Sequence, residues 1–217
     1  MILFISDLHK SLDSREEMDS VKWLLDILDE LKPDYLIGAG DWGEGMTIDD
    51  FSNILSRTRL ITVYGNHENF SIIKSFSMRD GQIISIGNVK VTGINGLIGD
   101  NENYGIPPNK FLRIISKLKD KNIDILISHQ PPYLPEIYPK MRCNEAAELM
   151  LQALEQIKPK LHLNGHMTDG CYSYYEFEWG KYLRVDSSSK FRCYAIIDKD
   201  VTVYQRGEEV FNFSLQL

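Results

Sequence analysis

The fold is decided by a stretch that reads LITVYGNHE, from Leu60 to Glu68. Its first five residues are mostly apolar or β-branched, which predicts a buried strand. An amide, an imidazole and a carboxylate follow at once, and ligand sites of layered α/β proteins lie at the C-terminal ends of strands. Taken alone, the Asn66-His67 pair is more often a hydrogen-bonded turn than a site. The case for a functional site therefore depends on the other predicted strands.

Four other predicted strands end in the same kind of polar residue. Imidazole nitrogens, carboxylate oxygens and an amide oxygen form a mixed ligand shell suited to Mn²⁺, Fe or Zn²⁺, and not to Ca²⁺ or a thiolate-bound structural zinc. His162 would point differently from His166 in an alternating strand, so a buried core histidine is the better interpretation there. The candidate residues are Asp7, His9, Asp41, Asn66, His67, His129 and His166.

Amphipathic helices and further strands surround these motifs. Ser14 and Thr47 each open a capping box, and Asn144 is a further predicted N-cap. A Gly87-Asn88 turn between two β-rich runs predicts a hairpin, which adds antiparallel strands to a β-α-β-α-β start. Residues 95–109 lack periodicity and fit either a rim over the site or a solvated loop. The remaining predicted strands are 171–178, 181–186, 191–197, 201–205 and 208–215.

Aromatic residues gather in the C-terminal strands. They fit either an interface or one covered face of a sheet, and ordinary sheet packing is the favoured interpretation. The residues are Tyr172, Tyr174, Tyr175, Phe177 and Trp179.

Length and composition exclude several classes of protein. With 217 residues, 43% of them hydrophobic, the chain is expected to form one domain over residues 1–217. A formal charge of −7 argues against a broad surface that tracks nucleic acid. Cys143, Cys171 and Cys193 are widely spaced and lack a CxxC pattern, which predicts reduced thiols in an intracellular protein. No basic leader and no run of membrane-spanning length is present, so we expect a cytoplasmic protein.

The ordered motifs resemble those of the calcineurin-like metallophosphoesterases. The resemblance covers nearly the whole chain, since a late Val-Asp-Ser-Ser-Ser run at 185–189 and the Tyr-Ala-Ile-Ile-Asp strand after it are similar to the end of small family members. It implies a four-layer αββα sandwich, in which two mixed β-sheets pack face to face between helices. The motifs are Asp7-x-His9, Gly40-Asp41, Gly65-Asn66-His67-Glu68, Ser128-His129 with two prolines following, and Gly165-His166.

The resemblance also implies a centre of two divalent metal ions. Asp7 and His9 would bind one ion, and Asp41 would bridge the two. We expect Mn²⁺, with Fe, Zn²⁺ or Ni²⁺ as alternatives. The ligands implied for the other ion are Asn66, His129 and His166.

His67 would bind no metal and would face the scissile phosphate, where an imidazole can stabilise developing charge or protonate the leaving oxygen. A metal-bridging hydroxide would attack the phosphorus in line. Glu68, next to His67, fits either a residue that orients the site or a surface carboxylate.

Thr168 marks the one informative departure from the family pattern. The usual final motif is Gly-His-x-His, and its second histidine is normally a ligand of the first metal. Here the motif reads Gly165-His166-Met167-Thr168. Thr168, through its hydroxyl or a water, and Asp169, by a small backbone shift, are alternatives for completing the shell. We therefore predict a weak or differently selective first metal site.

These observations favour a metal-dependent phosphoesterase acting on a small molecule or nucleotide, with a phosphodiester preferred slightly over a monoester. The alternative is a catalytically weak or inactive scaffold of the same fold, and the presence of His67 argues against it. A nuclease acting on DNA ends is disfavoured because no basic patch is apparent, and extended nucleic-acid or membrane binding is not expected. A protein phosphatase ranks below the small-molecule diesterase.

Overall fold

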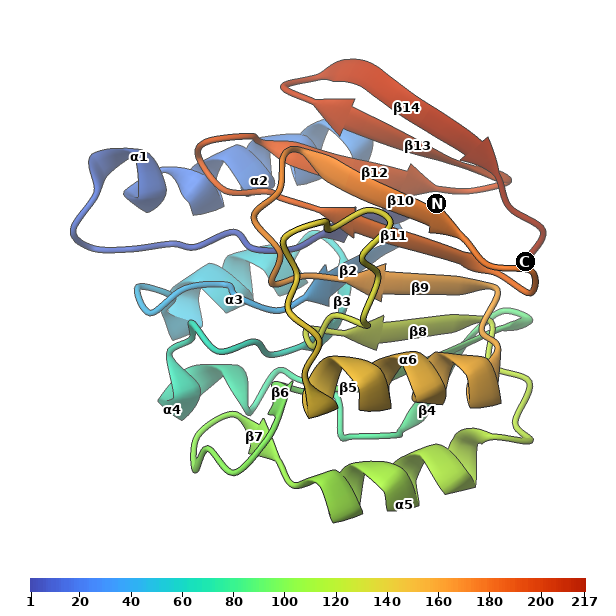
Figure 1. Ribbon diagram of the computed structural model, residues 1–217. Helices are drawn as coiled ribbons and strands as arrows, with labels where there is room; N and C mark the ends of the chain where they lie inside the picture. Colours follow the sequence, from blue (N-terminus) through green and yellow to red (C-terminus); the bar gives the residue numbers. More distant parts are fainter.

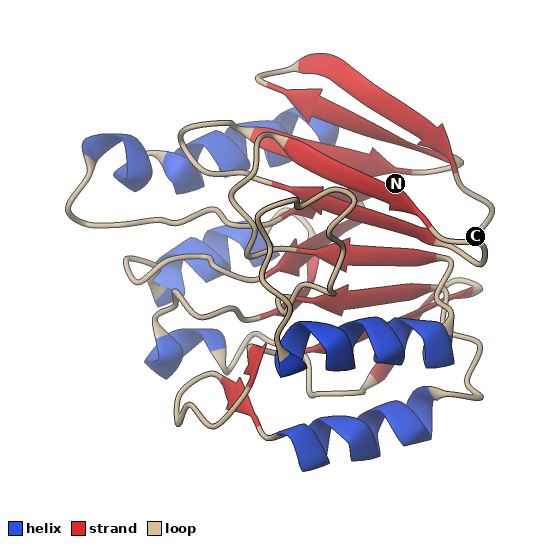
Figure 2. Cartoon of the chain, in the orientation of Figure 1, coloured by secondary structure: helices blue, strands red, loops and turns tan.

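Two six-stranded mixed sheets pack face to face, with helices on both outer faces, in the computed structural model of residues 1–217 (Figures 1 and 2). The predicted four-layer αββα sandwich is confirmed. The first sheet contains, from edge to edge, β14 (Glu208–Ser214), β13 (Asp200–Gln205), β12 (Cys193–Ile197), β1 (Ile2–Ile5), β2 (Tyr35–Ala39) and β3 (Arg59–Val63). The second contains β10 (Tyr172–Glu176), β11 (Lys181–Val185), β9 (Leu161–Asn164), β8 (Ile125–Ser128), β5 (Val89–Ile94) and β4 (Ile83–Ile86).

Alternating side chains in β1 separate the layers. Ile2 and Phe4 join the core between the sheets, whereas Leu3 and Ile5 face the outer helices. This follows from the two-residue period of a strand, and because both faces are covered, all four residues are apolar. The helices are α1 (Arg15–Met18), α2 (Ser20–Leu31), α3 (Ile48–Leu55), α4 (Phe70–Ile73), α5 (Pro108–Leu118) and α6 (Glu145–Ile157). Buried side chains of α2 and α3 pack on the first sheet, and those of α5 and α6 pack on the second.

The parallel strands of both sheets end near one another. β1, β2 and β3 are parallel in the first sheet, and β5, β8, β9 and β11 are parallel in the second. The loops that follow β2 and β8 touch, since the ring of His129 reaches the carbonyl oxygen of Ala39, 2.8 Å away. The sheets therefore bring polar residues that are far apart in the sequence to one place.

Most predicted elements are present, with small differences at their ends. Thr47 caps α3 in a reciprocal capping box, and Asn144 caps α6. The expected first helix is broken in two at Asp19, which is the C-cap residue of α1 and occupies the N-cap position of α2 without a side-chain hydrogen bond. The predicted hairpin is formed by β4 and β5. The aperiodic stretch contains two short paired segments, β6 (Leu97–Ile98) and β7 (Gly105–Ile106).

The C-terminal aromatic residues cover sheet faces, as ordinary sheet packing requires. Tyr172 stacks on Phe211 with ring centroids 5.0 Å apart, and Tyr174 lies 4.8 Å from Phe213. These four rings pack against the core between the sheets. Phe177, on the opposite side, packs against the core beneath α5 and α6.

Cys171 and Cys193 form a disulfide bond, so the prediction of three reduced thiols is wrong. Cys171 immediately precedes β10 of the second sheet, and Cys193 opens β12 of the first. The bond therefore ties the two sheets together, and its 22-residue separation has no sequence signature. Cys143 is free and exposed. The cysteines therefore no longer indicate an intracellular location.

None of the helices combines the length and the apolar composition that crossing a bilayer requires.

Candidate metal centre

Four of the candidate residues turn sharply out of their strands in a backbone conformation that non-glycine residues rarely adopt. Backbone hydrogen bonds between neighbouring loops hold two of them, from Asp7 N to Gly40 O and from His9 N to Asp41 O, both 3.0 Å. Such conformations cost on the order of 1 kcal/mol each and persist where the surroundings enforce them, commonly at functional sites. The residues with positive φ are Asp7 (56°), His9 (52°), Asp41 (54°) and His166 (70°).

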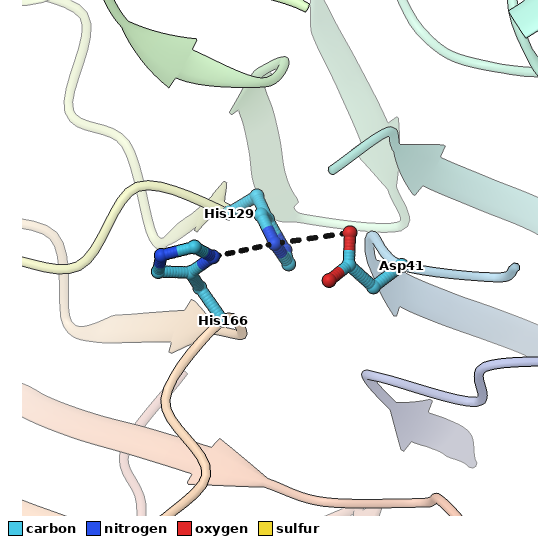
Figure 3. A group of neighbouring side chains, drawn as sticks. All are labelled: Asp41, His129 and His166. Carbon is cyan, nitrogen blue, oxygen red and sulfur yellow. Dashed lines mark hydrogen bonds and ion pairs between the residues drawn. The ribbon is translucent and has the colours of Figure 1, made fainter. Parts of the chain in front are cut away.

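Hydrogen-bond acceptors converge on one point beside His129. Its Nδ1 lies 2.8 Å from the carbonyl oxygen of Ala39 and donates to it, so Nε2 is the ring nitrogen that faces the other candidate ligands. That Nε2 lies 3.2 Å from each of three atoms: Asn66 Oδ1, His166 Nδ1 and Asp41 Oδ1. Figure 3 shows the His129 ring between His166 and Asp41. Atoms that each bond one small divalent ion at about 2.0–2.2 Å have comparable separations, so this donor set fits a metal.

The charges at this point call for a cation. Burial would lower the pKa of His129, but the carboxylates of Asp41 and Asp7 outweigh it and raise the pKa to about 9. Burial also opposes ionisation of Asp41, yet the charge and hydrogen bond of His129 hold its pKa below the usual range. Burial and the charge of His129 lower the pKa of His166 to about 4. The protein thus places an anion and a neutral imidazole around a position that attracts positive charge, which a divalent ion supplies.

A second group of ligand atoms shares Asp41 with the first. Asp7, His9 and Asp41 offer atoms that all lie within 4.8 Å of one another. Nε2 of His9 is 3.8 Å from Asp7 Oδ1 and 3.7 Å from Asp41 Oδ2. Burial raises the pKa of Asp7 to about 6, and Ser6 donates a hydrogen bond to its Oδ2. Asp41 is therefore the carboxylate common to two adjoining metal-binding groups.

Two glycines let the loops approach this closely. A Cβ atom on Gly65 would lie 2.1 Å from Asp41 Oδ1 and 2.7 Å from His129 Nε2. A Cβ atom on Gly165 would lie 2.2 Å from Ser6 Oγ and 2.9 Å from Asp7 Oδ2. Any side chain at either position would displace candidate ligands, so the glycines before Asn66 and His166 are part of the site.

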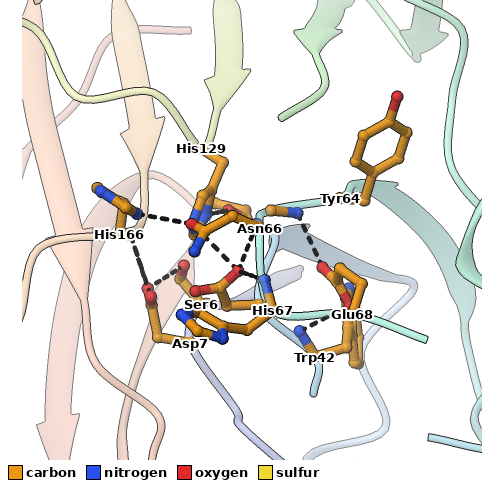
Figure 4. A network of polar contacts seen from close by, with 12 residues as sticks. Ser6, Asp7, Trp42, Tyr64, Asn66, His67, Glu68, His129 and His166 are labelled. Carbon is orange, nitrogen blue, oxygen red and sulfur yellow. Dashed lines mark hydrogen bonds and ion pairs between the residues drawn. The ribbon is translucent and has the colours of Figure 1, made fainter. Parts of the chain in front are cut away.

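Glu68 is buried and joins two of the loops that carry the site (Figure 4). Its carboxylate accepts hydrogen bonds from Gly65 N at 2.8 Å and Trp42 N at 3.1 Å. Burial raises the pKa of Glu68 to about 8, against the effect of the hydrogen bond from Gly65. The interpretation of Glu68 as a surface carboxylate is therefore wrong, and its hydrogen bonds agree with the interpretation as an orienting carboxylate.

His67 lies beside the ligand groups and belongs to neither. Its backbone N–H donates to Asp41 Oδ1 at 2.8 Å, and its ring centroid is 5.6 Å from that of His9. About half of its side chain is exposed, and Nδ1 lies 3.1 Å from Glu44 Oε1. The imidazole therefore stands at the solvent-exposed side of the centre.

Thr168 and Asp169 are exposed and lie in neither ligand group. Arg184, which is fully buried, anchors the loop that carries them. Its guanidinium donates hydrogen bonds to the carbonyl oxygens of Met167, Asp169 and Gly170 at 2.7, 2.8 and 3.0 Å. All four acceptors of Arg184 are neutral, the last being Ser173 Oγ. The group that contains His9 thus offers three protein ligands.

All seven candidate residues predicted from the sequence lie at this centre. His162 does not belong to it: its side chain is fully buried, and its Nε2 lies 2.8 Å from Ser128 Oγ. Glu44 and Ser6 also contact residues of the centre and were not among the predicted residues. Glu44 carries a weak signal, because it follows the Gly40-Asp41 turn by only three residues, whereas Ser6 carries none beyond its place next to Asp7.

Comparison with known proteins agrees with this architecture. A family model described as calcineurin-like phosphoesterase matches residues 1–168. A solved protein of Thermus thermophilus is similar in fold, with a TM-score of 0.68 and 13% identity over 94% of this chain and 97% of that one. A dimetal phosphatase from Danio rerio has a TM-score of 0.63 and 11% identity over 99% and 98%.

GAP50, the anchor in the inner membrane complex of Plasmodium, has a TM-score of 0.62 and 12% identity over 100% of this chain and 88% of its own. At such identities the likeness to solved structures shows the fold alone. None of the curated proteins matches the chain.

Proposed function

The chain belongs to the calcineurin-like phosphoesterase family, and from that premise we propose that it is a metal-dependent phosphoesterase that hydrolyses a phosphodiester or nucleotide-type phosphate ester. The observation that carries the proposal is the convergence of Asn66 Oδ1, His129 Nε2 and His166 Nδ1 beside Asp41. An amide oxygen, two imidazole nitrogens and a carboxylate gathered at one point form a donor set that suits a divalent transition-metal ion. We propose Mn²⁺ as the ion, and a pair of ions because two ligand groups share Asp41.

Divalent ions bound here would supply positive charge to the substrate phosphate and lower the pKa of a water molecule. The chain's own residues hold that arrangement in place. Asp41 accepts hydrogen bonds from the backbone N–H groups of Asn66 and His67, both 2.8 Å, which fixes the loop that carries both side chains. Asp7 accepts from His166 N at 3.0 Å, which joins the two ligand groups.

His67 is the proposed catalytic residue. Its exposed imidazole can donate a proton to the leaving oxygen or stabilise charge that develops on the phosphate, and the nearby Glu44 carboxylate fixes the ring's orientation. Contributions of this kind are typically about 10²–10⁴-fold in rate. The residue's place outside both ligand groups agrees with a role in chemistry and not in metal binding.

The test is hydrolysis of bis-p-nitrophenyl phosphate by EDTA-stripped protein, with and without Mn²⁺. We expect turnover that requires the ion and falls at least about 100-fold in His67→Ala, with metal content unchanged. The same rate in the variant would remove His67 from the mechanism. No turnover with Mn²⁺, Fe, Co²⁺, Ni²⁺ or Zn²⁺, on this diester or p-nitrophenyl phosphate, would overturn the enzymatic function.

A scaffold of the same fold is the second candidate, and the observation that favours it is the exposed position of Thr168. With only Asp7, His9 and Asp41 as protein ligands, the first ion would be held more weakly than the second. Calorimetric titration separates the two cases. Two equally tight ions would refute a weakened first site, whereas one ion without turnover would favour the scaffold.

The proposed partner is a phosphate ester of a small molecule or nucleotide, without extended nucleic-acid or membrane contact. A cytoplasmic location stays a prediction that cell fractionation tests. The disulfide between Cys171 and Cys193 makes that test informative, because such bonds are uncommon in reducing compartments.

A further inference from the structure

We propose that the loop carrying Thr168 forms one wall of a substrate subsite, which binds the nucleobase and the second phosphate of a nucleoside diphosphate-type ester. The proposal rests on the proposed function, because the subsite adjoins the metal centre through His166. In this chain the segment that follows Gly165-His166 would therefore serve recognition instead of completing the metal shell.

Two adjoining cavities lie next to the centre, and His67 lines neither of them. The first, about 430 Å³, is lined by the segment 138–141 and by residues 167–169. The second, about 340 Å³, is lined by His166 and Met167 together with residues 97–98, 130–131, 141–142, 144 and 146. Met141 and Met167 line both cavities, so the two adjoin at these side chains. Because His166 lines the second cavity and is also a candidate metal ligand, that cavity adjoins the candidate metal centre.

The walls of the subsite are fixed by buried contacts. Met141 and Met167 pack against a core cluster of Leu134, Tyr138 and Tyr182. The hydroxyl groups of Tyr138 and Tyr182 lie 2.8 Å apart, and both residues are buried, which anchors the segment before Met141 to β11. Arg184 anchors the opposite wall through the carbonyl oxygen of Met167 at 2.7 Å. A pocket held in this way is preorganised and loses little entropy on binding.

The chemistry of the lining selects the ligand. Thioether groups of Met141 and Met167 make favourable contacts with aromatic rings and adapt to flat groups. Lys140 and Arg142 are exposed on the same segment and take part in no ion pair, so they are free to bind an anion. Asp169 adds one carboxylate, which can accept a hydrogen bond from an exocyclic amino group. An aromatic ring, an amino group and an extra phosphate occur together in a nucleoside diphosphate.

The experiment measures equilibrium binding to Mn²⁺-loaded full-length protein, freed of excess metal, and needs no turnover. Inorganic phosphate, ribose 5-phosphate, AMP and ADP are titrated calorimetrically. We expect AMP to bind at least about tenfold more tightly than ribose 5-phosphate, through the contacts of the base with Met141 and Met167. We expect ADP to bind at least about threefold more tightly than AMP, through Lys140 and Arg142.

Three variants test the location. Thr168→Trp and Met141→Trp fill the cavity from opposite walls and should each abolish the preference for AMP over ribose 5-phosphate, while leaving phosphate binding and metal content unchanged. Lys140→Gln combined with Arg142→Gln should abolish the preference for ADP over AMP. Arg113→Gln removes an exposed cation of α5 and is the matched control, expected to change nothing.

The outcomes separate the subsite from the proposed function. Binding of phosphate without any preference for AMP would overturn the subsite and leave the phosphoesterase intact. A preference for AMP that survives in both Trp variants would overturn its location. Failure of phosphate and of every nucleotide to bind the metal-loaded protein would overturn both.

Discussion

His67 Nδ1 lies 3.1 Å from Glu44 Oε1, and both side chains are more than half exposed, at 53% and 63%. This is the only carboxylate that touches the proposed catalytic ring through its side chain. The pair stands on the open side of the centre, so its contribution to stability is small, as for exposed ion pairs in general. The expected role of the Glu44 carboxylate is to fix the orientation of the His67 imidazole.

Glu44→Ala should therefore lower kcat by about tenfold, by analogy with the loss of other orienting partners. Metal content and the melting temperature should stay unchanged, because Glu44 is exposed and touches neither ligand group. Steady-state kinetics with bis-p-nitrophenyl phosphate measure the effect, and Glu155→Gln on α6 is the control. An unchanged kcat in Glu44→Ala would show that the ring needs no such partner.

Glu68→Ala should lower the free energy of unfolding. The substitution leaves the N–H groups of Gly65 and Trp42 without their partner in a buried environment, at a cost of about 1–3 kcal/mol for each group. Urea denaturation should show a lower free energy of unfolding than in Glu44→Ala, which removes an exposed carboxylate of the same loops. Equal stability of the two variants would mean that water replaces the carboxylate of Glu68.

Gly65→Ala should abolish metal binding while the fold persists. The new methyl group would lie 2.1 Å from Asp41 Oδ1, and the closest other atoms belong to His129 and to the Asp41 backbone, so several candidate ligands must move. Gly87→Ala is the matched control, since nothing lies within 4 Å of its Cβ position and only its positive φ of 58° is strained. Metal analysis after gel filtration should find ions in the control alone. Full occupancy in Gly65→Ala would contradict the close approach.

Metal binding should stabilise the fold. An ion that binds only the folded chain adds about 2.7 kcal/mol at a concentration 100 times its dissociation constant. Thermal denaturation with and without Mn²⁺ measures the shift, which we expect to shrink in Asp41→Asn, because Asp41 belongs to both ligand groups. A shift of equal size in the variant would mean that the ion binds elsewhere.

His162 should make the fold sensitive to acid. Burial lowers its pKa to about 3 in the folded chain, against about 6.5 in an unfolded one. Between these values the unfolded chain binds the extra proton. The contribution of His162 is therefore complete above about pH 6.5, and the free energy of unfolding falls by up to about 1.4 kcal/mol per unit as the pH drops toward 3.

His162→Gln should flatten this dependence, because an amide does not titrate. Urea denaturation of both proteins at several pH values between 4.5 and 7.5 gives the two slopes. Identical slopes would show that the imidazole is already neutralised or solvated in some other way. A structural role for His162 alone would change the stability at every pH by the same amount.

Much of the fold was predictable because its signals are local. The apolar run before Gly65 indicates a strand covered on both faces, and the capping box at Thr47 marks a helix start. The break between α1 and α2 at Asp19 was not predictable, because no Gly or Pro in the sequence marks it.

The sequence by itself determined which residue types stand at the strand ends, because an Asp, Asn or His directly after a buried strand is a local pattern. That was enough to name every candidate ligand and His67. Only the tertiary structure decided what those residues meet, such as the carbonyl oxygen of Ala39 that turns Nε2 of His129 toward Asn66, and Glu44 beside His67. It likewise brought Cys171 to Cys193 and buried Glu68, because such contacts arise when distant segments pack, and no spacing in one chain encodes them.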